Sequence, residues 1–281
     1  MMRAKLNLMT AALALLAATC HADELADKGR DIFKKNQHSV VTVQVVLKAT
    51  GRSGNPSESK QDLTGAVIDP SGLTVLALSA VDPAELYRRL SDEYKIETQI
   101  DDVKILLDDG TELPAEIVLR DKDLDLAFIR PKTKPSAPMA AVDLSKSAAV
   151  EALEPVIALN RLNRAAGRAY SASVERISAV MLKPRTFYIP DSGASSAALG
   201  SPVFALNGNI VGIFVMRAVS AGDSSGRNAR ENMTLVLLPA EDILKGAKQA
   251  PEAKGEADKP AEKAADKPAG TKEEKDGKDQ K

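Results

Sequence analysis

The sequence predicts an all-β fold of two small antiparallel barrels packed together, with short flanking helices. Short runs rich in β-branched residues alternate with turn signals from residue 39 to residue 245. The Pro-rich link KTKPSAP, at 132–138, divides these runs into two sets, one over about 39–133 and one over about 150–245. Many short strands in two sets are typical of two closed barrels.

The first set opens with an amphipathic helix expected within 23–38 and a β-branched strand over SVVTVQVVLKA, at 39–49. TGAVIDPSGLTVLALSAV, at 64–81, predicts two strands around a Pro-Ser-Gly turn. A helix is expected in DPAELYRRLSDEY, at 82–94. VKILLDDGTELPAEIVL, at 103–119, predicts a hairpin around Asp109 and Gly110, and DLDLAFIRP, at 123–131, predicts the last strand.

The second set follows the link. Strands are expected in PVIALN, YSASVERISAV and RTFYI, which begin at residues 155, 170 and 185. SPVFALNGNIVGIFVM, at 201–216, predicts a hairpin around Asn207 and Gly208, and NMTLVLLP, at 232–239, one more strand. AEDILKGAKQ, from residue 240, predicts a closing helix.

The first 22 residues indicate a secretory signal peptide. A basic start, MMRAK, precedes LNLMTAALALLAA, an apolar run too short for a stable membrane span, and small residues follow it. Cleavage after Ala22 would remove Cys20, the only cysteine, and leave a mature chain without disulfide, thiolate nucleophile or cysteine metal ligand. The alternative is a lipoprotein anchored at Cys20, which Thr19 fits poorly. We expect a periplasmic or secreted protein.

The last segment, 246–281, is expected to be a disordered tail. It contains no Val, Ile, Leu, Met or aromatic residue, and lysines and acids alternate in near-equal number. Such a composition cannot bury enough apolar surface to offset the entropy lost on ordering. The tail is interpreted as a solubilising segment, with a spacer or a weak contact to surface polymers as the alternative.

The strand segments carry a resemblance to the HtrA/DegP-like branch of the trypsin-like serine proteases, over 39–245. TGAVIDPSGLTVLALSAV resembles the family segment that ends in the catalytic histidine. VKILLDDGTELPAEIVLRDKDLDLAFIR is similar to the segment with the catalytic aspartate, and GSPVFALNGNIVGI to the strand pair after the nucleophile. The resemblance implies a trypsin-like double β-barrel. A following peptide-binding PDZ module is not found, since the tail begins directly.

The resemblance carries over only part of a catalytic triad. The aspartate position falls on Asp125, the histidine position on Ser79 and the nucleophile position on Leu199. Ala197 stands at an oxyanion-hole position where the family uses glycine. A serine nucleophile needs a neighbouring base, which Ser79 cannot supply near neutral pH, and Leu199 has no nucleophile. We therefore expect an inactive member, with Ser79 donating a hydrogen bond to the Asp125 carboxylate.

Other residues offer weaker routes to catalysis. The single histidine of the mature chain, His38, precedes the first strand and is interpreted as a surface residue. A Ser-Lys arrangement stays open as an alternative, because serines flank Leu199, at Ser192, Ser195, Ser196 and Ser201. No His/Cys cluster has metal-ligand spacing, and no cofactor is expected.

The charge of the chain argues against a nucleic-acid-binding protein, and three of its arginines gather in one loop. The formal net charge of −1 lacks the basic excess of a nucleic-acid-binding surface. NRLNRAAGR crowds Arg161, Arg164 and Arg168 into one loop, which is either a solvated loop or an anionic contact.

The function expected is non-enzymatic binding of an extended peptide or an envelope protein. In a trypsin-like cleft a peptide adds beside a strand through backbone hydrogen bonds, which needs no nucleophile. The residues expected to form the binding edge are Leu199, Gly200, Ser201, Gly212 and Phe214. Two alternatives stay open: a serine endopeptidase with an unconventional nucleophile, and a structural envelope protein.

Overall fold

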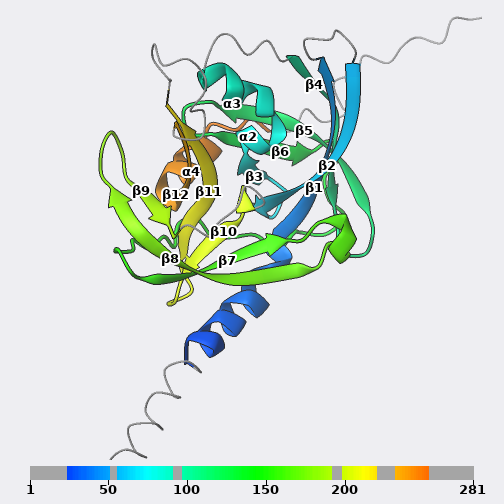
Figure 1. The fold of residues 1–281 in the computed structure, drawn as a ribbon. Coiled ribbons are helices and arrows are strands. Elements are labelled where there is room, and N and C mark those ends of the chain that lie inside the picture. The colour runs from blue at the N-terminus through cyan, green and yellow to red at the C-terminus, as the bar shows by residue number, and fades with distance from the viewer. Residues whose placement is uncertain (1–23, 51–55, 91–96, 192–197, 220–231, 253–281) are drawn as a thin grey trace, which may run out of the picture.

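The chain folds into two closed six-stranded antiparallel barrels that pack against each other (Figure 1). The computed structural model describes residues 24–50, 56–90, 97–191, 198–219 and 232–252. The all-β double barrel that the sequence predicts is confirmed, with short helices at its edges. No helix in these ranges is long and apolar enough to span a membrane.

The first barrel has the strand order β1-β2-β3-β6-β5-β4. Its strands are β1 (Val40–Thr50), β2 (Pro56–Val67), β3 (Thr74–Ala77), β4 (Glu97–Leu106), β5 (Glu112–Asp121) and β6 (Leu126–Pro131). The two predicted turns lie where expected: Gly72, at φ +93°, turns β2 into β3, and Gly110, at φ +85°, turns β4 into β5. Both backbones are left-handed, which glycine adopts without a Cβ penalty.

The second barrel has the order β10-β11-β12-β9-β8-β7. Its strands are β7 (Pro155–Arg161), β8 (Tyr170–Met181), β9 (Phe187–Pro190), β10 (Pro202–Ala205), β11 (Ile210–Ala218) and β12 (Met233–Pro239). The β10–β11 hairpin turns at Gly208, at φ +82°, as the Asn-Gly pair predicts. β11 is buried over its first six residues and contacts both barrels.

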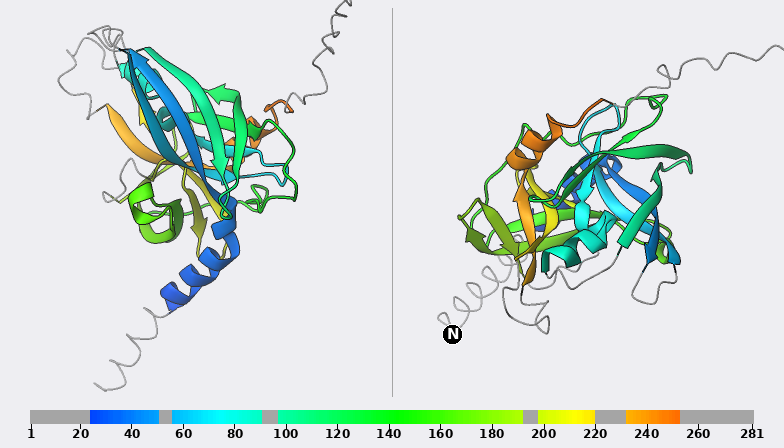
Figure 2. Two further views of the ribbon diagram at one scale, coloured as in Figure 1. Left: turned by 90° about the vertical axis from the view of Figure 1, so that its right-hand side faces the viewer. Right: turned by 90° about the horizontal axis from the view of Figure 1, so that it is seen from above.

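A shared hydrophobic core joins the barrels, which Figure 2 shows side by side from two further directions. Phe128 and Leu126 of β6 belong to the same buried cluster as Phe204 of β10 and Val215 of β11. All four side chains are at most 2% exposed. Because burying one large apolar side chain stabilises the fold by about 1.5–3 kcal/mol, separating the barrels would be costly.

Helices close the shared core at its ends. The helix over 24–36, at the lower edge of Figure 1, buries Ile32 in the core, and Phe33 packs partly against it. The other short helices are η1 (Gln37–Ser39), α2 (Leu78–Val81), α3 (Pro83–Leu90), η2 (Arg164–Ala166) and α4 (Ala240–Ala247). Ile243 of α4 is fully buried in the shared core.

The start of the expected tail is corrected by the structure. Gly246 is buried within α4, where a Cβ would lie 3.0 Å from the Phe128 ring. Arg130 donates from Nε to the Pro251 carbonyl over 2.8 Å, and its guanidinium lies 3.6 Å from the Glu252 carboxylate. Contacts with the folded domain therefore extend as far as Glu252. The composition did not indicate this, because the hydrogen bond to Arg130 is made by the backbone carbonyl of Pro251. The expected signal peptide, Cys20 and residues 253–281 lie outside the described residues.

Two truncations test where the folded chain ends. Removal of residues 253–281 is expected to leave the melting temperature unchanged, because that composition has no apolar side chain to bury except alanine and proline. Removal of residues 250–281 takes away the Pro251 carbonyl and leaves the nearly buried Arg130 Nε unpaired. An unsatisfied buried donor costs about 1–3 kcal/mol, and each kcal/mol lowers the midpoint by about 2–4 °C in a domain of this size. Equal melting temperatures for the two truncations, measured by circular dichroism, would contradict this boundary.

Candidate functional site

Asp125 occupies the turn between β5 and β6 in a left-handed backbone conformation, with φ +59°. Aspartate adopts this region more readily than most residues, although it costs backbone energy. The Asp125 carbonyl accepts a hydrogen bond from the Leu78 N–H over 2.8 Å. The backbone of Asp125 is therefore held against the start of α2.

The Asp125 carboxylate accepts two further hydrogen bonds from the same short helix. The Ser79 N–H donates to Oδ1 over 2.7 Å, and the Ser79 hydroxyl donates to Oδ2 over 2.8 Å. Both residues are buried, Asp125 at 3% and Ser79 at 6% exposure. The predicted hydrogen bond between Ser79 and Asp125 is present, and the backbone bond beside it was not predicted.

A third donor comes from the second barrel. The Met216 N–H of β11 donates to Asp125 Oδ2 over 2.7 Å. A carboxylate buried without donors would cost several kcal/mol, and three short hydrogen bonds offset that cost. The sequence gives no signal for Met216, because the group that binds Asp125 is a backbone amide. Asp125 thus ties α2 and β6 of the first barrel to β11 of the second.

Leu199 lies beside the same strand. Gly200 donates from its N–H to the Phe214 carbonyl over 2.8 Å and holds φ +84°, and a Cβ on it would lie only 2.2 Å from the Thr64 carbonyl oxygen. Leu199 itself is 8% exposed. Gly200, the residue after Leu199, and Asp125 therefore bind β11 two residues apart, at Phe214 and Met216. Ala197, at the expected oxyanion position, lies outside the described residues.

The residues expected to form the binding edge need correction. Gly212 is flanked by β10 and β12, and a Cβ on it would lie 1.8 Å from the Leu238 carbonyl oxygen, so its role is strand packing. Phe214 is 1% exposed, and both its N–H and its carbonyl bind the segment at Gly200 and Ser201. A ligand can therefore meet this strand only beyond Phe214, which the sequence pattern did not distinguish.

The end of β11, after Ile213, has a described strand on one side only. β12 pairs with β11 from Gly212 to Ala218, whereas β10 pairs with it only as far as Ile213. The N–H groups of Phe214 and Met216 leave β11 on the side away from β12. Because N–H groups alternate between the two sides of a strand, the Ala218 N–H leaves on that side too. No strand among the described residues pairs with β11 there.

Ser201 is not presented to a substrate. It is fully buried, and its Oγ has no hydrogen-bond partner among the described residues. Ser192, Ser195 and Ser196, the other serines that could supply a nucleophile, lie outside the described residues. Among the described residues no group of three or more His, Cys, Asp or Glu side chains could hold a metal ion.

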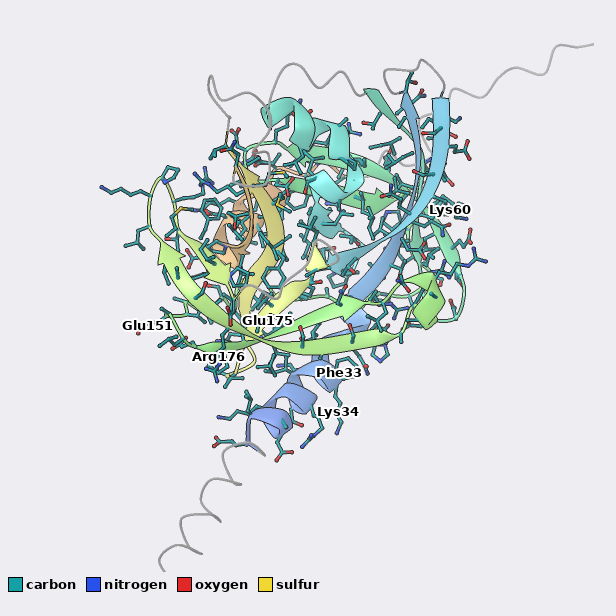
Figure 3. The ribbon with its side chains drawn as sticks, in the orientation of Figure 1. Phe33, Lys34, Lys60, Glu151, Glu175 and Arg176 are labelled. Carbon is teal, nitrogen blue, oxygen red and sulfur yellow. The ribbon has the colours of Figure 1, made fainter. Side chains whose placement is uncertain are left out.

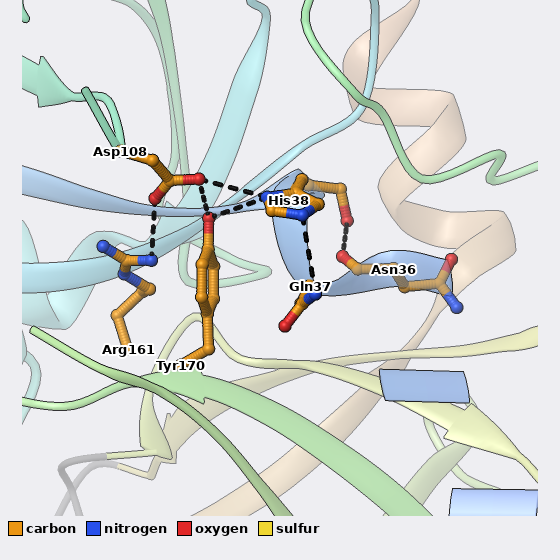
Figure 4. Close-up of polar contacts among 7 residues, drawn as sticks. Asn36, Gln37, His38, Asp108, Arg161 and Tyr170 are labelled. Carbon is orange, nitrogen blue, oxygen red and sulfur yellow. Dashed lines mark hydrogen bonds and ion pairs between the residues drawn. The ribbon is translucent and has the colours of Figure 1, made fainter. Parts of the chain in front are cut away.

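His38 belongs to a separate polar cluster, drawn in Figure 4. Its Nδ1 lies 3.1 Å from Asp108 Oδ2 and 3.3 Å from the Tyr170 hydroxyl, and its side chain is 59% exposed. The Tyr170 hydroxyl and Arg161 also bind Asp108. Burial raises the pKa of Asp108, but hydrogen bonds from Tyr170 and His38 and the Arg161 charge outweigh it and hold that pKa below its usual value. The expectation of a surface histidine is confirmed.

Comparisons with known proteins agree with this geometry. A family model for the trypsin-like peptidase domain matches residues 63–213. The fold is similar to a solved structure of a variant of the HtrA-type protease AlgW with a decapeptide, at a TM-score of 0.56 and 15% identity. The match covers 79% of this chain and 66% of that one, so the chain spans just under two thirds of AlgW as solved. A comparison with curated proteins found no match.

The Asp125 cluster predicts a graded loss of stability. Asp125→Ala leaves the buried Ser79 N–H and the half-buried Met216 N–H without an acceptor, so we expect the free energy of unfolding to fall by about 2–6 kcal/mol, at about 1–3 kcal/mol for each unsatisfied donor. Ser79→Ala removes only the hydroxyl bond and should cost about 0.5–1.5 kcal/mol. Exposed Asp123→Ala is the matched control, expected within about 0.5 kcal/mol of the parent. Urea unfolding measures all three, and an Asp125→Ala variant as stable as the control would contradict the assignment.

Proposed function

The chain belongs to the trypsin-like peptidase domain family, and from that premise we propose that it is an exported, catalytically inactive member that binds an extended polypeptide. The observation that carries the proposal is the Asp125 carboxylate. It accepts hydrogen bonds from Ser79 and Met216, and among the described residues the one imidazole, that of His38, belongs to the separate cluster with Asp108 and Tyr170. Under this proposal the chain lacks the base and the nucleophile for peptide hydrolysis but keeps β11, the strand beside which a peptide would bind.

Inactivity follows from the side chains at the two key positions. Peptide hydrolysis by this fold needs a hydroxyl and a base that takes its proton, and the aspartate only orients that base. Ser79 uses its proton to bind Asp125, and its hydroxyl is no base near neutral pH. Leu199 presents carbon where the nucleophilic oxygen would be. Without both groups, binding and oxyanion stabilisation alone leave only a residual rate.

Binding is supported by the open end of β11. A peptide laid antiparallel to Met216–Ala218 would meet the Met216 carbonyl and the Ala218 N–H, which no described strand pairs with, whereas the Met216 N–H is already bound to Asp125. A cavity of about 180 Å³ adjoins this stretch, lined by Leu124, Phe187, Val236 and residues of β11, and it offers room for a ligand side chain. The decapeptide in the similar AlgW structure is consistent with this mode, although that likeness is one of fold.

Export is supported by the composition of the first 22 residues, with their basic start and short apolar run. The proposed location is the periplasm or the exterior, with removal of the segment after Ala22. Under this proposal residues 23–38 form an N-terminal helical segment, 39–245 form the protease-fold domain, extended by the structure to Glu252, and the remainder is a tail.

The alternative in a different class is a serine endopeptidase with an unconventional nucleophile. We expect the full chain to leave casein uncut and to remain unlabelled by a fluorophosphonate probe, because Ser79 and Leu199 supply neither base nor nucleophile. In-gel fluorescence after probe treatment measures this. Labelling that disappears on Ser201→Ala or Ser196→Ala would overturn the proposal in favour of the enzyme.

Binding at β11 is tested with an unfolded polypeptide. Fluorescein-labelled α-lactalbumin, reduced and alkylated so that it cannot refold, should bind the chain, measured by fluorescence anisotropy. Ala218→Pro removes the N–H on the open side while leaving the β12 pairing in place, and it should weaken binding about two- to tenfold, as expected for one lost hydrogen bond.

Ala218→Ser is the matched control, because it keeps the N–H and should bind like the parent chain. Equal affinity of the Pro and Ser variants would show that the polypeptide does not add to this strand. Absence of any binding by the parent chain would favour the structural envelope protein instead.

A further inference from the structure

A second pocket lies between β2, the β4–β5 hairpin and the loop that joins β7 to β8. It measures about 570 Å³, and we call it the basic pocket. Four cationic and two anionic side chains line it: Lys60, Arg161, Arg164, Arg168, Asp62 and Glu112. The three arginines are those that the sequence crowds into NRLNRAAGR, and the proposed function does not use them.

The two carboxylates of the basic pocket are already occupied. Asp62 accepts from Arg168 Nε over 2.7 Å on one oxygen and from Gln44 over 2.9 Å on the other. Burial raises the pKa of Asp62, but the hydrogen bonds from Arg168 and Gln44 outweigh it and lower that pKa. Glu112 is held by Lys104 at 2.9 Å. Both acids also interact with Lys60 through charge, and the four cations that line the basic pocket still exceed its two carboxylates.

Two of the four cations are held by carboxylates, and the other two form no ion pair with a described carboxylate. Arg161 is 9% exposed, lies 3.9 Å over the Tyr170 ring and binds Asp108 (Figure 4), and its buried Nε has no partner among the described residues. Arg168 has φ +53° and turns back onto Asp62. Lys60 and Arg164 make no ion pair with any described carboxylate, and Figure 3 shows Lys60 on β2, at the edge of the first barrel.

The basic pocket adjoins the leucine position through a continuous run of contacts. A Cβ on Gly200, the residue after Leu199, would meet the Thr64 carbonyl oxygen first, at 2.2 Å. The Thr64 hydroxyl donates to the Asn160 side chain, whose oxygen also accepts from the Arg161 N–H over 2.8 Å. Asp62 lies two residues before Thr64 on β2, so it points to the same face of the strand. Contacts through Thr64 and Asn160 therefore connect the segment at Gly200 with the strand and the loop that carry these cations.

We propose that the basic pocket binds the carboxylate side chains of the polypeptide ligand, so that the chain selects acidic extended segments. The inference rests on the proposed function for the polypeptide nature of the ligand. Arg161 and Arg168 are held in place by Asp108 and Asp62. Lys60 and Arg164, which form no ion pair with a described carboxylate, supply the charge-assisted hydrogen bonds to the carboxylates of the ligand.

Three short fluorescein-labelled peptides test the inference, with valine alternating with glutamate, serine or lysine. By fluorescence anisotropy at low salt, the Val–Glu peptide should bind the full chain about tenfold more tightly than the Val–Ser peptide, and the Val–Lys peptide more weakly than both. The double charge reversal Lys60→Glu with Arg164→Glu should remove at least about tenfold of the Val–Glu affinity and leave Val–Ser binding unchanged.

The matched control is Lys34→Glu with Lys35→Glu. It makes the same change in net charge on exposed residues of the helix over 24–36, which Figure 3 places away from Lys60. This control should bind like the parent chain, and melting temperatures should match for both variants. A basic-pocket variant that binds all three peptides like the parent overturns this inference and leaves the proposed function standing.

Other outcomes distinguish failure of the basic-pocket inference from failure of the proposed function. If Ala218→Pro weakens every peptide while the parent binds Val–Glu and Val–Ser equally, β11 binds polypeptide and the basic pocket selects nothing. If no peptide binds the parent chain, both proposals fall together. If inorganic phosphate displaces the Val–Glu peptide more effectively than chloride at equal ionic strength, the basic pocket is a phosphate site and the acidic-segment inference is overturned.

Discussion

The hydrogen bonds to the Asp125 carboxylate are the interaction on which the arrangement of the two barrels depends. A buried carboxylate is costly unless donors surround it, and here the donors come from α2 and from β11, one on each side of the junction. In an active protease of this fold the aspartate orients an imidazole. In this chain Ser79, which we propose stands at the histidine position, donates to both oxygens of Asp125, and the carboxylate links the two barrels through Ser79 and Met216.

The hydrogen bonds of Asp125 also determine which part of β11 is available to a ligand. Because Asp125 uses the Met216 N–H, β11 is fixed at the point where its pairing with β10 has ended. Its last residues then have one side on β12 and one side without a described strand. In the basic pocket, Asp62 binds Arg168, and Asp108 binds Arg161. Carboxylates therefore position both the proposed binding edge and the arginines of the basic pocket.

The sequence predicted the double barrel because β-branched runs and turn glycines are local signals. Gly72, Gly110 and Gly208 each turn a hairpin where the pattern placed it. The contact of Ser79 with Asp125 followed from a family resemblance that names both positions. The sequence did not predict the roles of Met216 and Pro251, because both act through backbone atoms, which carry no residue signature. Nor did it predict the partners of Arg161, because Asp108 lies far away in the sequence, in the turn between β4 and β5, and because Tyr170 faces Arg161 only through the register of the β7–β8 pair.

Amide hydrogen exchange at two residues of β11, followed by NMR, tests the central claim most directly. In the free chain the Met216 amide should exchange slowly, because it is bound to Asp125, and the Ala218 amide should exchange faster. Saturation with reduced and alkylated α-lactalbumin should slow exchange at Ala218 and leave Met216 as slow as before. A Met216 amide that exchanges as fast as an unstructured peptide, or an Ala218 amide unaffected by the polypeptide, would contradict the account.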